Sequence, residues 1–122
     1  PIEWALQHKF EKIIVVRTRP AGYRKGEDSQ LQKDMIQRFY RSTPEFAQTL
    51  AASNARYDRQ IEEIERLDRR GRILQIAPSQ PVTISRLEGD MEKLGALYYL
   101  GYHDARAMMP KIKEYLGIQR AD

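Results

Sequence analysis

Four consecutive β-branched apolar residues, Ile13 to Val16, stand near the start of an otherwise polar chain. An apolar run of this length, without alternation with polar residues, predicts a strand buried on both faces. Such strands lie in parallel sheets that helices cover. The run ends in Arg17-Thr18-Arg19-Pro20, which brings two cations and a chain breaker to its C-terminal end. We therefore expect a buried strand near residues 12–18.

The other apolar positions predict helices and one more strand. Apolar residues recur at helical spacing from Ile2 to Lys9, from 31 to 41, and in one long pattern from Pro44 until Gly71. The glycine suits the end of a helix, and the proline suits a first turn. The stretch Arg72–Ala77 predicts a second strand.

The C-terminal third predicts one more helix. Ser85-Arg86-Leu87-Glu88 has the form of a capping box, so Ser85 should cap this helix. Gly101 lies inside it, which is typical of close packing or a break. Pro110 should kink or interrupt the helix, and Gly117 should end it.

The expected class is α/β, in the order α-β-α-α-β-α, with strands near 12–18 and 72–77 covered by helices. Two strands joined by a helical crossover should be parallel. A sheet of two parallel strands is a poor independent structure, so we expect a larger α/β/α sheet or a second copy to complete it. The start at Pro1-Ile2-Glu3-Trp4, without Met, also predicts a piece of a longer protein. A processed leader is the alternative.

Composition narrows the function classes. The chain has 122 residues, of which 41% are hydrophobic and 31% charged, which is typical of a globular domain. It has no cysteine, which excludes disulfides, thiolate metal sites and cysteine nucleophiles and fits the cytoplasm. The net charge of +4 permits peripheral contact with an anionic membrane. Acids match bases along 56–68, so we expect a solvated helix face and no nucleic acid.

The chain lacks the common catalytic and cofactor motifs. It has no G-x-S-x-G nucleophile elbow, no G-x-G-x-x-G dinucleotide loop and no P-loop. His8 and His103 are its only histidines, and they have no metal-ligand spacing. We therefore predict no catalytic residue, no metal and no cofactor in this chain.

One candidate binding edge remains. Arg17 and Arg19 leave the end of the first expected strand, Ser79 leaves the end of the second, and Arg86 stands at the expected start of the last helix. Parallel strands place these ends at one edge, where ligands bind in open α/β sheets. Guanidinium groups beside a helix N-terminus would form an anion site. Alternatively, the arginines pair with acids such as Glu88 or Asp90 and only fasten the loops.

Several short motifs, taken in order, give the chain a family resemblance. Individually they are weak, but their order is specific and they cover nearly the whole chain. The chain resembles bacterial patatin-like phospholipases in the following segments: Ile2-Glu3-Trp4-Ala5, Lys12–Pro20, Tyr23-Arg24-Lys25, Arg56-Tyr57-Asp58, Ile76-Ala77-Pro78-Ser79, Ser85-Arg86-Leu87-Glu88 and Tyr98-Tyr99-Leu100-Gly101-Tyr102.

The resemblance implies the C-terminal part of a serine lipid acyl hydrolase with an α/β core. Residues 1–20 would end the catalytic core, and 21–122 would form a C-terminal helical and strand module. That family uses a Ser–Asp dyad in G-x-S-x-G and D-G-G/A motifs, and both are absent here. The segment would begin just after the catalytic Asp, so no catalytic residue is carried over.

The leading hypothesis is therefore a non-catalytic segment of a patatin-like phospholipase. Its partners would be the rest of the parent catalytic domain and, through the parent, lipid acyl esters. The alternative is an independent α/β ligand-binding or protein-interaction module. As an isolated segment, with an uncovered strand, the chain should form a homodimer.

Overall fold

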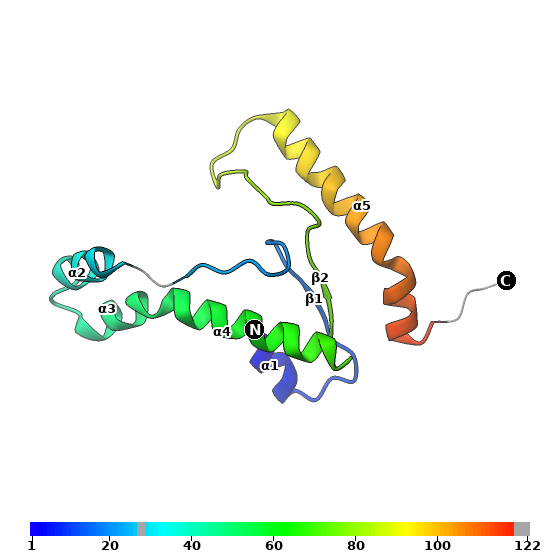
Figure 1. Cartoon of the computed structure of the whole chain (residues 1–122), viewed down its shortest axis with the longest axis horizontal. Coiled ribbons are helices and arrows are strands. Elements are labelled where there is room, and N and C mark those ends of the chain that lie inside the picture. The colour runs from blue at the N-terminus through cyan, green and yellow to red at the C-terminus, as the bar shows by residue number, and fades with distance from the viewer. Residues whose placement is uncertain (27–28, 119–122) are drawn as a thin grey trace. The chain divides into compact units, whose positions relative to one another are not determined.

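The computed structural model describes residues 1–26 and 29–118, which divide into two compact units. The first unit is Pro1–Tyr23 with Ile64–Asp122, and the second is Arg24–Glu63. Figure 1 shows the elements in chain order: α1 (Ile2–Gln7), β1 (Ile14–Val16), α2 (Gln30–Phe39), α3 (Pro44–Ala51), α4 (Ser53–Arg69), β2 (Leu74–Ile76) and α5 (Met91–Leu116).

The two strands form a small parallel sheet in the first unit. Ile14 lies opposite Leu74, and Val16 lies opposite Ile76. The predicted α/β class and the parallel pairing are confirmed, although both strands are shorter than the expected ranges. Helices flank this sheet, and α5 packs beside β2.

Burial is greatest at the residues that immediately precede the two strands. Ile73 is 1% exposed, and Ile13 is also buried, whereas Val16 is 73% exposed. The expectation that the whole run from Ile13 to Val16 is buried on both faces is therefore wrong at Val16. The reason is that, among the described residues, the sheet has two strands only, so nothing covers the far end of β1.

Helix α5 differs from its expected form at the start and in the middle. Asp90, not Ser85, is the N-cap, and its side chain accepts from the Glu92 N–H at 2.9 Å. Of the two outcomes predicted for Pro110, a kink or an interruption, the interruption is wrong, because α5 continues to Leu116. Hydrogen bonds of Asp104 with Ser79 and of Tyr115 with Arg72, on either side of the proline, hold α5 on the rest of the first unit. Gly117 ends it at a φ of +71°, as predicted.

In the second unit, α2 begins with the capping box of Ser29 and Gln32. The long helical pattern from Pro44 is divided in two, and α3 ends where Ala52 precedes α4. The Ser53 hydroxyl donates to the Leu50 carbonyl at 2.8 Å. Such a local bond competes with the helical backbone bonds and favours a break. The order therefore contains one more helix than expected.

Helix α4 ends at Arg69, and Gly71 follows with a φ of +72°, as the sequence predicts. Within residues 1–26 and 29–118, no helix combines the length and the apolar character that crossing a bilayer requires.

Candidate functional site

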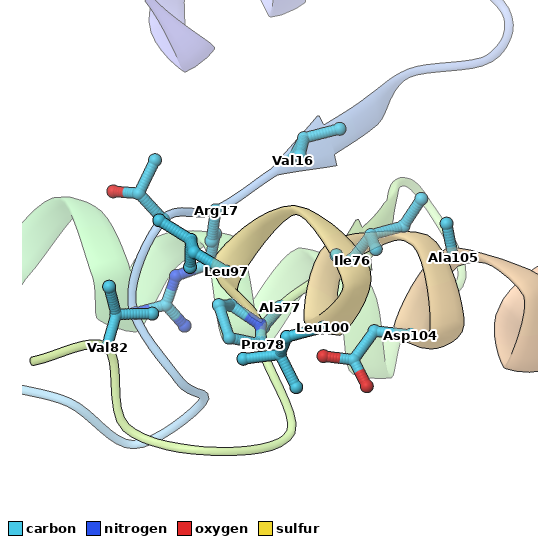
Figure 2. Close-up of a pocket in the computed structure, with 12 residues that line it drawn as sticks. Val16, Arg17, Ile76, Ala77, Pro78, Val82, Leu97, Leu100, Asp104 and Ala105 are labelled. Atoms are coloured by element: carbon cyan, nitrogen blue, oxygen red, sulfur yellow. The ribbon is translucent and has the colours of Figure 1, made fainter. Parts of the chain in front are cut away.

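A cavity of about 370 Å³ lies in the first unit, between the C-terminal ends of the strands and helix α5. This volume is within the range of about 300–1,000 Å³ that is typical of small-molecule sites. Its lining is almost wholly apolar (Figure 2). The lining residues are Val16, Arg17, Thr18, Ile76, Ala77, Pro78, Val82, Leu97, Leu100, Gly101, Asp104 and Ala105.

Helix α5 forms one wall of the cavity through residues at helical spacing. Leu97, Leu100, Gly101 and Ala105 lie three or four positions apart along α5, so they share one side of the helix and line the cavity. A Cβ added at Gly101 would meet no atom within 4 Å. The expectation that Gly101 marks close packing or a break is therefore wrong. Its missing side chain instead leaves space in the cavity.

Arg17 is the buried charged residue of this site. It is 7% exposed, and its Nη1 lies 3.5 Å from Glu65 Oε1 and 3.3 Å from Gln75 Oε1. Its Nε and Nη2 atoms are buried and have no hydrogen-bond partner in the described part of the chain. The backbone N–H of Arg17 donates to the Ile76 carbonyl at 2.8 Å, which fixes the residue beside the end of β2.

The other predicted edge residues take separate places. Arg19 Nη1 donates to the Val82 carbonyl at 3.1 Å, and its guanidinium lies 5.2 Å from the centroid of the Tyr23 ring. Arg86 lies in an exposed turn, five positions before α5 begins, so the expected helix N-terminus is not there. Of the four predicted edge residues, Arg17 alone lines the cavity.

Ser79 faces a carboxylate. Its backbone N–H donates to Asp104 Oδ2 at 2.8 Å. The Ser79 hydroxyl, and then its backbone N–H, lower the pKa of Asp104 because both bonds favour the charged carboxylate. Asp104 therefore already occupies the position in which Ser79 would have received an anion. The spacing from Gly101 to Asp104 is the signal that could have placed this carboxylate at the cavity.

Tyr115 is a structural residue that the sequence did not reveal. Its hydroxyl accepts from the Ile13 N–H at 2.9 Å and donates to the Arg72 carbonyl at 2.9 Å. It thereby joins the chain segments entering β1 and β2 to the end of α5. The Lys12 ammonium lies 4.8 Å from the centroid of the Tyr115 ring. These contacts hold α5 on the sheet beyond Pro110.

In the part of the chain that the structure describes, no group of three or more His, Cys, Asp and Glu residues could hold a metal ion. The cavity instead combines an apolar wall with one buried guanidinium and one ionised carboxylate.

One comparison with known proteins places the chain in a family. A family model described as Domain of unknown function (DUF6363) matches residues 43–117. This match covers more than half of the 122 residues. The chain belongs to the DUF6363 family. The DUF6363 segment contains α3, α4, β2 and α5, and so supplies every lining residue from Ile76 to Ala105, whereas β1 precedes it. Neither the curated proteins nor the solved structures gave a match.

Proposed function

We propose that this chain is a non-catalytic C-terminal segment of a patatin-like phospholipase, a serine lipid acyl hydrolase. The observation that carries the proposal is the ordered series of motifs from Ile2 to Tyr102 that resembles these enzymes. The chain itself has neither a G-x-S-x-G serine nor a D-G-G/A aspartate. The parent enzyme would supply both, and this segment would act as a scaffold beside them.

The exposed end of β1 supports this role. Val16 is 73% exposed, although it belongs to the most apolar run of the chain. Sheets of two strands are marginal by themselves, and open strand edges pair readily with further strands. In the proposed parent, strands of the catalytic domain continue the sheet at β1 and cover Val16. The partners are then the rest of that domain and, through it, lipid acyl esters, and the parent is cytoplasmic with peripheral membrane contact.

The decisive experiment is to obtain the complete reading frame that encodes this chain. We expect G-x-S-x-G and D-G-G/A motifs upstream in the same frame. The full protein should then hydrolyse a lipid acyl ester, and an alanine at its elbow serine should abolish that activity. A complete frame without the two motifs would refute the proposal.

The isolated chain provides the complementary test. We expect it to have no esterase activity, because acyl transfer needs a nucleophile that a partner residue activates. A chromogenic short-chain ester measures this directly. Turnover well above the buffer rate that persists through further purification would contradict the proposal that this segment is non-catalytic.

An independent ligand-binding module is the second candidate. The cavity favours it, because the lining residues all belong to the first unit and need no parent domain to surround them. A reading frame without catalytic motifs, together with ligand binding by the isolated chain, would select this second candidate.

A further inference from the structure

We propose that the cavity binds an uncharged aliphatic molecule that carries an oxygen acceptor, and that Arg17 donates a hydrogen bond to this oxygen. This site is additional to the proposed scaffold role and does not depend on it. The class of ligand follows from three features of the cavity: its apolar wall, the unpartnered donors of Arg17, and the charges around them.

The apolar wall of the cavity favours a ligand with an aliphatic chain. Ile76, Pro78, Val82, Leu97 and Leu100 all contribute to a lining whose exposed surface is almost entirely apolar. Burying alkyl groups on such a surface is favourable by about 0.8 kcal/mol for each CH₂ group. A cavity of about 370 Å³ accommodates a medium-length alkyl chain.

Arg17 selects the acceptor. Nη1 contacts Glu65 and Gln75, whereas Nε and Nη2 are buried without a hydrogen-bond partner in the described residues. Buried donors without acceptors destabilise a fold, so a ligand oxygen at these two atoms gains a bond that the protein alone leaves unmade. Figure 2 shows the guanidinium on the side of the cavity where Val82 and Pro78 lie. Both donors are buried, so the proposed bond requires the side chains over them to shift when the ligand enters.

The surrounding charges select a neutral head. Nε and Nη2 form the pair of parallel N–H groups that could also bind a carboxylate. However, Glu65 already balances the charge of Arg17, and Asp104 adds a second carboxylate to the lining. A ligand carboxylate would therefore lose hydration without a free cation to receive it, which is costly in an apolar site. A ligand with an ammonium group would instead be repelled by the guanidinium of Arg17.

The first experiment fills the cavity without disturbing the fold. Octanol is titrated into the wild-type chain and into Gly101→Leu, with binding followed by calorimetry and ligand-observed NMR. No atom lies within 4 Å of a Cβ at Gly101, and leucine favours a helix more than glycine does. The matched control is Gly95→Leu, which is equally open, also lies in α5 and does not line the cavity.

We expect Gly101→Leu to abolish octanol binding and Gly95→Leu to retain it, with both variants melting at or above the wild-type temperature. Equal binding by the two variants would overturn the proposed site, as would a wild-type chain that does not bind octanol.

The second experiment tests the head group. Octanol, octanoate and octylamine share one chain length, and we expect octanol to bind most tightly. Removing Arg17 alone would take away the cation beside Glu65 and change the net charge of the site, so the test variant is Arg17→Met with Glu65→Gln, which replaces both charges. Loss of one hydrogen bond should weaken octanol binding about tenfold.

The comparison has three contrary outcomes. Tighter binding of octanoate would assign the site to an anion, and tighter binding of octylamine would assign the head to Asp104. Unchanged octanol affinity in the folded double variant would show that Arg17 does not donate a hydrogen bond to the ligand oxygen. Each of these results overturns the proposal.

Discussion

The hydroxyl of Tyr115, near the end of α5, forms hydrogen bonds with the residues that precede β1 and β2. Its removal should therefore lower the stability of the fold. We predict that Tyr115→Phe lowers the free energy of unfolding by about 1–3 kcal/mol, because the Ile13 N–H and the Arg72 carbonyl both lose a partly buried partner. Urea unfolding followed by circular dichroism measures the change. Tyr98→Phe is the control, because Tyr98 is exposed. Similar stabilities for the two variants would show that water replaces the Tyr115 bonds.

The carboxylate of Asp104 should give the chain a pH dependence. Its pKa is lowered in the folded state by the Ser79 hydroxyl and backbone N–H, so the unfolded state binds the proton more readily. The stabilisation is therefore present above the unfolded pKa of about 4 and disappears as the pH falls through the lower folded pKa. We predict that wild type loses stability relative to Asp104→Asn over this acidic range. Melting temperatures at a series of pH values measure it, and parallel profiles would contradict the prediction.

The start of helix α2 depends on a reciprocal pair of hydrogen bonds. Ser29 Oγ accepts from the Gln32 N–H at 3.2 Å, and Gln32 Oε1 accepts from the Ser29 N–H at 2.9 Å. We predict that Ser29→Ala destabilises α2 by about 1 kcal/mol. Thr43→Ala at the start of α3 is the matched control, because Thr43 makes no side-chain cap bond. Amide hydrogen exchange across 30–39 should accelerate in the first variant only.

The elements that the sequence predicts well are those bounded by residues with a fixed backbone preference. Gly71 and Gly117 have positive φ angles that end α4 and α5, and Pro44 opens α3. The missed boundaries have no such residue. The break before Ser53 coincides with a hydroxyl that bonds back to the Leu50 carbonyl, and Asp90 caps α5 although Ser85 has the form of a capping box. Local patterns do not rank two acceptable caps, because the neighbouring packing decides between them.

The candidate site was only partly predictable for a related reason. Parallel pairing places Arg17 at the correct edge, and helical spacing places Leu97, Gly101 and Ala105 on one face. What the sequence does not give is the partner of each polar group. Glu65 binds Arg17 across 48 positions and Asp104 binds Ser79 across 25, and such pairs are fixed by tertiary packing, not by spacing. Where the sequence predicted an anion-binding edge, the structure therefore has a cavity in which Glu65 balances the charge of Arg17.

At the scale of the whole molecule, the aromatic residues of α5 are prominent. Tyr98, Tyr99 and Tyr102 could serve either in helix packing or in stacking on a ligand, and packing is the commoner role. In the structure they are 68%, 61% and 46% exposed. They make edge contacts within α5, such as that between Tyr98 and Tyr99. Exposed apolar surface of this kind is typical of a face that another chain covers.

We predict that the isolated 122-residue chain forms a symmetric homodimer. An uncovered strand such as β1 presents unpaired backbone groups, and pairing two copies of it is the simplest way to satisfy them. Sedimentation equilibrium at micromolar concentration measures the mass. Val16→Lys should shift the equilibrium toward monomer, because Val16 is the exposed apolar residue of β1, whereas Thr83→Lys in an exposed loop position should not. A monomer mass, with a cooperative melt independent of concentration, would mean that the chain needs no partner for β1 and would favour the independent binding module over the enzyme segment.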